Sequence, residues 1–488
     1  MKCEGAMSEP ASGRPRGCPT PDRHEHAIVL RPLLFLALCA SLAAVELDGR
    51  VRTALAEVPR GGEAAVAVWD CRARTWVALA GDPAPLRLAS TTKLLVSAAA
   101  LSVLGPRFEF VTRVYALGTV RGGAVPGLGV IGGGDPTIDE HFWQGDPERC
   151  LRAWAERVRA AGIQRIDGDL VVDNRLFRGP IRPTTYPTEG GNLTKWFSAP
   201  ASAFAYNDNC IDVRAVPTAP GQPCRIETRP RSPRITVVNR TRTVSGSGDA
   251  RFLVDRAPDS NTITVSGSYA KTTSWFPVAI HQDPDLLAGD AFAAVLADAG
   301  IVLGGEVKLG AVDPRLGPML IDHRSPLIPA LNLLNQRSQN FYGEQILRII
   351  GLRRAREGSV AAGARAVREL CAPLMGEDAV GGVVLDGSGL SYGNVASARA
   401  LCRLLASMDA QPLGAVLATS LKDKPHAGVT GKVKTGTLAS ASCLAGYVEG
   451  RTGRLAFTIL LGQGSANGWG WGPPLRERLY EVIAEAVR

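Results

Sequence analysis

The feature that most constrains this chain is a serine and a lysine that lie three residues apart at the start of an apolar run. Ser90-Thr91-Thr92-Lys93 precedes residues 94–101, all apolar except Ser97, and such a run predicts a buried helix. Residues i and i+3 share one helix face, so the Lys93 amine can lie beside the Ser90 hydroxyl. A neighbouring base activates a serine, and a helix N-terminus offers free backbone N–H groups to an oxyanion. The spacing alone is common by chance, so its meaning depends on the rest of the chain.

A second candidate motif is Ser338-Gln339-Asn340. Its spacing lets a hydroxyl and an amide point the same way from a turn or from the start of a helix. The Ser338 hydroxyl could then relay a proton to a leaving amine, and the Asn340 amide could hold a substrate carbonyl. Both residue types are also favoured as helix caps, which is the alternative explanation of this motif.

A third candidate is Lys434-Thr435-Gly436-Thr437, inside an expected strand over residues 431–438. Glycine in a strand allows another backbone or a ligand to approach closely. The Lys434 ammonium and the two threonine hydroxyls suit a substrate carboxylate. We therefore predict that Thr435, Gly436 and Thr437 bind substrate. The backbone N–H of Thr437 could pair with that of Ser90 as an oxyanion hole, and an ordinary exposed edge strand is the alternative.

The bulk composition is that of a soluble globular protein with a large core. The chain has 488 residues, which is enough for two or three domains; 45% of them are hydrophobic and 21% are charged. The formal net charge of +9 comes largely from arginines that are spread along the chain without a dense basic block. We therefore predict no nucleic-acid partner. Peripheral association with an anionic membrane or envelope stays open, and the oligomeric state is not defined by the sequence.

The N-terminus carries a predicted export signal over residues 1–44. Arginines precede an apolar run, residues 33–45, which contains small residues at positions 40, 41, 43 and 44. The run is too short to span a bilayer comfortably, and it is typical of a secretory signal cleaved near Ala43. The protein is therefore expected in the periplasm or the cell envelope. Lipidation at Cys39 and an uncleaved membrane tether are the alternatives.

Cysteines and histidines do not form a recognisable metal site. The chain has ten cysteines, and removal of the signal leaves seven without a C-x-x-C pair. Cys210 and Cys224 could pair in an oxidising compartment, with buried free thiols as the alternative. The six histidines show no ligand spacing. We predict no metal.

The order of the three motifs is far more specific than any one of them. S-x-x-K, S-x-N and K-T-G in this order mark the serine β-lactamases and the penicillin-binding proteins. From Lys93 to Ser338 the chain advances 245 positions, far more than one penicillin-recognising domain needs between these motifs. The sequence therefore predicts that one or two further domains are inserted there.

This arrangement resembles the class C low-molecular-mass penicillin-binding proteins, the D-alanyl-D-alanine carboxypeptidase/endopeptidase family. The resemblance covers nearly all of the chain after the signal. Further runs are similar to that family's patterns, and they lie at residues 134–137 (G-D-P-T), 167–173, 197–200 (F-S-A-P), 207–209 (N-D-N), 338–345 and 386–391 (D-G-S-G-L-S). None of them needs to be catalytic, and the last is a turn by composition that is expected to shape the floor of the cleft.

The resemblance implies an α/β (α+β) fold built from three parts. A penicillin-recognising, β-lactamase-like catalytic domain, an antiparallel sheet flanked by helices, would be assembled from residues 45–105 and 312–488. An inserted mixed α/β domain would occupy residues 106–210 and 281–311. A nested β-rich domain would occupy residues 211–280.

The resemblance also implies an acyl-enzyme mechanism that needs no metal or organic cofactor. Ser90 would attack the carbonyl of a D-Ala-D-Ala bond in peptidoglycan peptides while Lys93 takes its proton, and β-lactams would acylate the same serine. Ser338 and Lys434 would pass a proton to the departing amine. Asn340 would hold the substrate amide.

The implied substrate contacts include one departure from the family. Thr435 and Thr437 would bind the terminal carboxylate. Family members that read diaminopimelate carry an acid a few positions before the F-S-A-P-like run, where this chain has Asn192. Asn192 is therefore a predicted substrate-binding residue that cannot pair with an ammonium as a carboxylate can. Residues 421–428 also differ from the glycine-rich loop that usually precedes K-T-G.

Three functions remain as alternatives. The prediction is a serine-type D-Ala-D-Ala carboxypeptidase, an endopeptidase, or both, because one site can cut either bond. A β-lactamase is the closest alternative, although it needs no long insertion and no second base for deacylation is identifiable. The other is a catalytically weak wall-binding or penicillin-sensing protein, against which the intact triple motif argues.

Overall fold

The structure is a computed structural model, and it describes residues 44–249, 251–257 and 259–488. Residues 47–488 form one compact unit by their backbone contacts. The expected export signal lies outside the described residues except for residue 44. Within the described part of the chain, no helix has the length and apolar character needed to cross a membrane.

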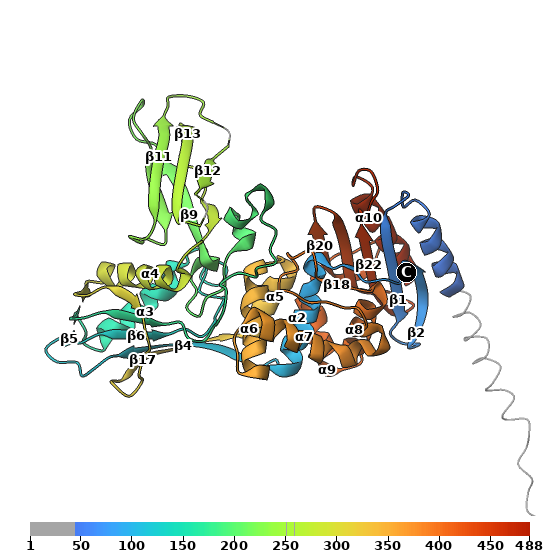
Figure 1. The fold of residues 1–488 in the computed structure, drawn as a ribbon, viewed down its shortest axis with the longest axis horizontal. Coiled ribbons are helices and arrows are strands. Elements are labelled where there is room, and N and C mark those ends of the chain that lie inside the picture. Colours follow the sequence, from blue (N-terminus) through green and yellow to red (C-terminus); the bar gives the residue numbers. More distant parts are fainter. Residues whose placement is uncertain (1–43, 250, 258) are drawn as a thin grey trace, which may run out of the picture. The chain divides into compact units, whose positions relative to one another are not determined.

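A six-stranded antiparallel sheet joins the two ends of the compact unit (Figure 1). The strand order is β19-β20-β21-β22-β1-β2, so a hairpin from the start of the chain pairs with strands from its end. The strand expected over residues 431–438 is confirmed as β20. The bounds are β1 Glu63–Asp70, β2 Thr75–Gly81, β19 Lys422–Asp423, β20 Thr430–Leu438, β21 Ala441–Glu449 and β22 Arg454–Gly462.

Helices cover both faces of this sheet. Successive side chains of a strand point to opposite faces, and in β1 Ala65 and Ala67 pack into one core while Val66 and Val68 pack into another. The first core contains α2 and α8; the second contains α10 and a helix that ends at residue 55. Because both faces are covered, β21 and β22 are buried almost throughout. The predicted antiparallel sheet flanked by helices is confirmed.

The helical part of the chain packs around α2, which is buried on all sides from Thr92 to Leu101. The apolar run after Ser90 therefore forms the expected buried helix. The bounds are α2 Thr92–Val103, α5 Leu327–Gln336, α6 Asn340–Ala355, α7 Val360–Met375, α8 Ala398–Asp409, α9 Pro412–Ser420 and α10 Gly472–Glu485, with the two-stranded sheet β3 Leu86–Arg87 and β18 Val395–Ala396.

The residues between the first two motifs form a mixed α/β part. Its five-stranded sheet has the order β16-β8-β6-β4-β17, and a three-stranded sheet, β15-β7-β5, lies in the same part. The bounds are β4 Glu109–Ala116, β5 Ala124–Val125, β6 Leu128–Ile131, α3 Glu148–Ala160, β7 Arg165–Ile166, β8 Leu170–Asp173, α4 Pro284–Asp298, β15 Val302–Leu303, β16 Val307–Leu309 and β17 Met319–Pro326. β17 follows the predicted boundary at residue 312 and pairs with β4, and the domain boundaries stay a prediction.

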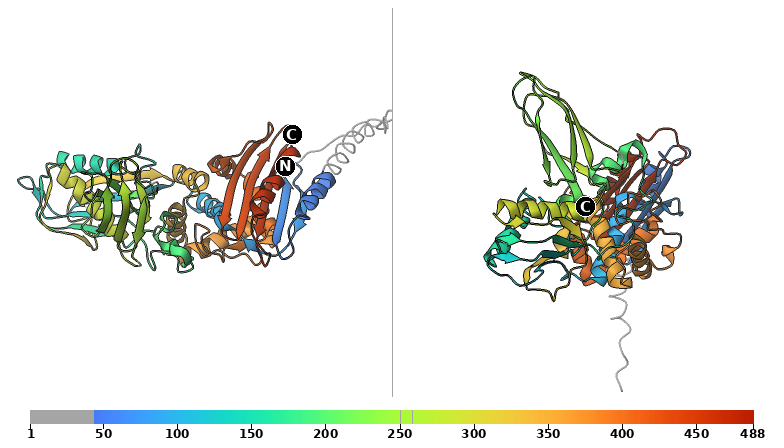
Figure 2. Two further views of the ribbon diagram at one scale, coloured as in Figure 1. Left: turned by 90° about the horizontal axis from the view of Figure 1, so that it is seen from above. Right: turned by 60° about the vertical axis from the view of Figure 1, so that its left-hand side comes forward.

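A β-rich part is nested within the mixed part and stands above α4 in Figure 1 and in the right-hand view of Figure 2. It contains two three-stranded sheets, β10-β9-β14 and β11-β13-β12. The bounds are β9 Cys210–Val216, β10 Arg225–Arg229, β11 Thr236–Thr243, β12 Leu253–Arg256, β13 Thr262–Tyr269 and β14 Phe276–Ala279.

The suggested disulfide between Cys210 and Cys224 is wrong for this structure, in which both thiols are free. Cys210 begins β9, whereas Cys224 precedes β10, whose Arg225 lies opposite Val216. The two cysteines therefore lie at opposite ends of the β9–β10 pair. The structure leaves each in its own apolar cluster.

Candidate active site

Ser90 lies in a short 3-10 helix, η1 (Ala89–Thr91), immediately before α2. Lys93 is in the first turn of α2, and its Nζ lies 3.0 Å from Ser90 Oγ. The lysine side chain is fully buried, whereas Ser90 keeps partial exposure. The arrangement leaves the hydroxyl open to a ligand and its neighbouring amine shielded from water.

The Lys93 amine is surrounded by oxygen atoms. Besides Ser90 Oγ, Lys93 Nζ donates to Asn340 Oδ1 at 2.8 Å and to the Ser388 carbonyl. Burial lowers the pKa of Lys93 to about 7, against the opposing effect of nearby carboxylates. A neutral amine has two N–H groups, and the Asn340 and Ser388 oxygens can only accept. Its lone pair then remains for the Ser90 hydroxyl, which is the geometry that a general base requires.

The second and third motifs meet on the other side of the cleft. Lys434 Nζ donates to Ser338 Oγ at 2.8 Å and to the Thr435 carbonyl at 2.7 Å. Lys434 is fully buried in β20, and this burial, together with the charge of Lys93, holds its pKa well below the ordinary value. The structure therefore brings four of the five predicted catalytic residues into two hydrogen-bonded pairs, Ser90 with Lys93 and Ser338 with Lys434. The fifth, Asn340, accepts a hydrogen bond from Lys93.

A cavity of about 370 Å³ opens over these groups. The predicted residues Ser90, Asn192, Ser338, Asn340 and Thr437 all line it. The other lining residues are Pro187, Trp196, Phe197, Gly389, Leu390, Tyr392, Leu438 and Ala439.

Two of the predicted substrate-binding residues do not line this cavity. The Thr435 side chain is exposed elsewhere on β20, and Gly436 is buried. Their assignment as substrate-binding residues stays a prediction.

Two glycines allow neighbouring segments to approach the backbone around Ser90. A Cβ on Gly436 would lie 2.8 Å from the Leu88 carbonyl oxygen, so β20 can press against η1 only with glycine there. Gly389 has φ +81°, and a Cβ on it would lie 1.9 Å from the Ala89 carbonyl oxygen. Ser90 is thus held between the K-T-G strand and the loop over residues 386–391.

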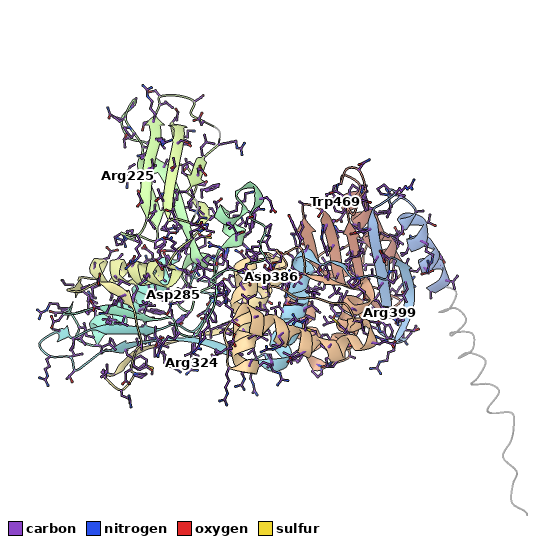
Figure 3. The ribbon with its side chains drawn as sticks, in the orientation of Figure 1. Arg225, Asp285, Arg324, Asp386, Arg399 and Trp469 are labelled. Carbon is purple, nitrogen blue, oxygen red and sulfur yellow. The ribbon has the colours of Figure 1, made fainter. Side chains whose placement is uncertain are left out.

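Sequence reasoning missed the buried carboxylates that hold this loop. Asp386, labelled in Figure 3, accepts from the backbone N–H of Gly389 at 2.6 Å and of Ser391 at 2.8 Å. Glu344 Oε1 accepts from the N–H of Ser388 and from Tyr186 Oη, both at 3.0 Å. These bonds place the Ser388 carbonyl against Lys93. The D-G-S-G-L-S run indicated a turn, but a backbone carbonyl that receives a lysine leaves no mark in a sequence.

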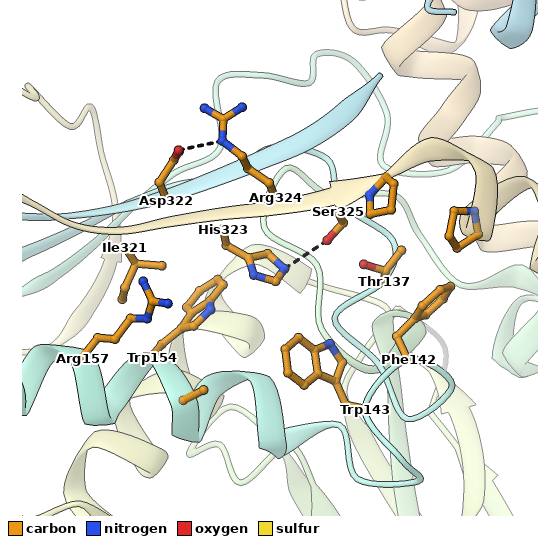
Figure 4. Close-up of a pocket in the computed structure, with 13 residues that line it drawn as sticks. Thr137, Phe142, Trp143, Trp154, Arg157, Ile321, Asp322, His323, Arg324 and Ser325 are labelled. Atoms are coloured by element: carbon orange, nitrogen blue, oxygen red, sulfur yellow. Dashed lines mark hydrogen bonds and ion pairs between the residues drawn. The ribbon is translucent and has the colours of Figure 1, made fainter. Parts of the chain in front are cut away.

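A larger cavity, about 490 Å³, lies between α3 and β17 and contains no residue of the three motifs (Figure 4). Its walls include Trp143, Trp154 and His323. His323 Nε2 lies 3.1 Å from Ser325 Oγ and 3.4 Å from Asp135 Oδ2. In a Ser-His-Asp triad the serine and the carboxylate contact different ring nitrogens. Both partners here contact the same nitrogen, so this cluster is not a second triad.

Comparison with known proteins agrees with this geometry. The sequence model of the D-Ala-D-Ala carboxypeptidase 3 (S13) family matches residues 47–469. A D-alanyl-D-alanine carboxypeptidase of Actinomadura sp. (strain R39) is 30% identical over an alignment 502 positions long, which covers 93% of this chain and 90% of that protein.

Solved structures show the same fold. The crystal structure of penicillin binding protein 4 (dacB) from Haemophilus influenzae superposes with a TM-score of 0.72 at 22% identity, covering 89% of this chain and 99% of the other. The same protein complexed with a β-lactam gives a TM-score of 0.67 at 21% identity over the same shares of the two chains. The predicted penicillin-recognising fold is confirmed. Because the family's sequence model matches residues 47–469, which is most of the chain, the chain belongs to the D-Ala-D-Ala carboxypeptidase 3 (S13) family.

Proposed function

We propose that this protein is an exported serine D-Ala-D-Ala peptidase that cleaves peptidoglycan stem peptides through an acyl-enzyme on Ser90. The observation that carries the proposal is the buried Lys93 amine 3.0 Å from Ser90 Oγ, with acceptor oxygens at its two other contacts. Family membership supplies the reaction class. The same serine is the site that β-lactams acylate.

Acylation begins with proton transfer from Ser90 to neutral Lys93. The Ser90 oxygen attacks the carbonyl carbon of the penultimate D-alanine, and a tetrahedral oxyanion forms. The backbone N–H groups of Ser90 and Thr437 stabilise this oxyanion, the role for which preorganised donors are most effective. Asn340 orients the base, because its Oδ1 accepts from Lys93 and its Nδ2 donates to the Phe197 carbonyl at 2.9 Å.

Collapse of the tetrahedral intermediate breaks the C–N bond and needs a proton on the departing amine. Ser338 donates that proton and receives another from the Lys434 ammonium, with which it is hydrogen-bonded. Burial makes Lys434 a readier proton donor than a lysine in water. A water molecule then adds to the ester carbonyl and gives a proton, through Ser338, to the neutral Lys434 amine, which restores its ammonium. The bond between Ser90 Oγ and the carbonyl carbon breaks, the Lys93 ammonium returns its proton to Ser90, and the shortened peptide leaves as the free acid.

The experiment that tests this function is product analysis by mass spectrometry. Purified sacculi and a synthetic pentapeptide ending in D-Ala-D-Ala are incubated with the protein. Loss of one D-alanine from the pentapeptide is expected, and conversion of cross-linked dimers to monomers would add endopeptidase action. Rapid turnover of a chromogenic cephalosporin without D-alanine release would instead support a β-lactamase. Peptide binding without any cleavage would support a binding protein.

Asn192 sets an expected substrate preference, because it lines the active-site cavity where a carboxylate would attract an ammonium. Asn192→Asp is expected to lower KM about 3- to 10-fold for a peptide with a free amine on its third residue, since a partly exposed ion pair contributes roughly 1 kcal/mol. Steady-state kinetics with the free and the N-acetylated peptide measure the effect. An equal change for both peptides would show that Asn192 does not face that side chain.

A further inference from the structure

The turn that carries Ser338 and Asn340 has a conformation that the backbone does not favour by itself. Ser338 has φ +59°, in the left-handed region, and α6 begins two residues later at Asn340. A non-glycine residue there requires support from its surroundings. Lys434 Nζ donates to the Ser338 hydroxyl. The Asn340 side chain accepts from Lys93 Nζ and donates to the Phe197 carbonyl. These three partners all belong to the proposed reaction site itself.

The middle residue of the turn is held from a different part of the chain. Gln339 is 8% exposed, and its Nε2 donates to Asp208 Oδ2 at 2.8 Å. Asp208 lies in the short 3-10 helix η4, Asn207–Asn209, which immediately precedes strand β9. The Gln339–Asp208 bond therefore joins the S-x-N turn to the inserted part of the chain.

Asp208 itself lies in a strained segment that hydrogen bonds of the Asn209 side chain hold in place. Asn207, Asp208 and Asn209 have φ of +53°, +54° and +50°, three consecutive left-handed residues without glycine. Asn209 Nδ2 holds the segment by donating to the Pro200 carbonyl at 2.9 Å and to Ser202 Oγ at 2.8 Å. Such strain persists only where the surroundings over-determine it, and it concentrates at functional sites.

The Asp208 carboxyl group lies beside another carboxyl group. Asp208 Oδ1 is buried and has no hydrogen-bond donor among the residues that the structure describes, and the Asp208 carboxyl lies within hydrogen-bond reach of Asp139. Two adjacent buried carboxyls share a proton rather than both ionise, and burial raises the pKa of both groups. Asp139, which is 1% exposed, also accepts from Tyr342 Oη on α6. The carboxyl pair thus contacts the S-x-N turn at Gln339 and the first turn of α6 at Tyr342.

We propose that Asp208, braced by Asp139, is a positioning residue that holds Gln339 and thereby aims Ser338 and Asn340 at the two catalytic lysines. The inference rests on the proposed function, in which Ser338 and Asn340 act in acylation. It assigns the inserted part of the chain a role in assembling the active site. Neither carboxyl touches the reacting atoms, so both act only through the turn.

The test exchanges the donor and the acceptor of the Gln339–Asp208 bond. Gln339→Glu removes the amide donor and sets a third carboxyl group against the Asp208–Asp139 pair, and it is expected to lower the second-order rate of acylation by a fluorescent penicillin about 10- to 100-fold, as loss of a buried hydrogen bond can. Asp208→Asn alone keeps an acceptor for Gln339, and a rate within about threefold of wild type is expected. The double variant restores the bond in reverse, from the introduced amide to the introduced carboxylate. We expect it to recover most of the lost rate.

Controls separate positioning from loss of stability. Gln411→Glu makes the same chemical change at an exposed position and is expected to acylate like wild type. Thermal melting of every variant shows whether the rate follows stability. A Gln339→Glu variant that acylates at the wild-type rate, or a double variant as slow as Gln339→Glu, would overturn the inference. Failure of the proposed function would appear differently, as a wild-type protein that is not labelled at all.

Discussion

Ser90→Ala is expected to abolish covalent labelling by a fluorescent penicillin and to lower D-alanine release by roughly 10⁴-fold or more, the scale on which loss of a nucleophile acts. The substitution removes the hydroxyl that lies 3.0 Å from Lys93 Nζ, on a residue that lines the cavity. Asn340 Oδ1 and the Ser388 carbonyl still hold the lysine in place. The variant should therefore fold and bind the antibiotic reversibly while it forms no ester.

A matched control is available on α2, the helix that follows Ser90. Ser102→Ala removes a hydroxyl that donates to the Ala98 carbonyl, nine residues after Lys93, and the variant should be labelled with wild-type stoichiometry. Denaturing gel fluorescence and intact-protein mass report the ester, and circular dichroism reports folding. Labelling of Ser90→Ala at the wild-type level would show that another residue is the nucleophile.

Local spacing predicted the parts of this site that lie within one element. Ser90 and Lys93 share one helical turn, so their contact follows from sequence positions alone. The meeting of Lys434 with Ser338 is different, because 96 positions separate them and only the order of the motifs in a known family indicated it. Alternation could not separate the faces of β21 and β22, since both faces are buried and most residues of both strands are apolar.

The supporting groups could not be predicted, for physical reasons. The Ser388 carbonyl is a backbone atom that any residue supplies, and its placement depends on Asp386 in the same loop and on Glu344 from the distant helix α6. A buried carboxylate has no sequence pattern that distinguishes it from an exposed one. The N-D-N run was visible at residues 207–209, but its left-handed backbone and its bond to Gln339 arise only from tertiary packing.

Lys93→Met is expected to reduce the acylation rate by about 10³- to 10⁴-fold, near the upper range for loss of a general base. Methionine fills much of the buried channel but cannot accept a proton. Lys271→Met changes an exposed lysine in the same way and should leave the rate unaltered. A Lys93→Met variant that acylates within tenfold of wild type would assign the base to another group.

The pH dependence of acylation tests the same base in the unmodified protein. Burial lowers the pKa of Lys93 from 10.5 to about 7, so the neutral, proton-accepting form is the major form above pH 7 and is lost below it. We expect the wild-type rate to fall about tenfold per pH unit below that pKa and to level off above it, as for a single essential base. In Lys93→Met the break near pH 7 should disappear, because the group that titrates there is gone. Stopped-flow measurement of penicillin acylation from pH 5 to pH 9 gives both profiles, and a wild-type rate that stays constant from pH 5 to pH 7 would mean that the lysine is already neutral at pH 5 or is not the base.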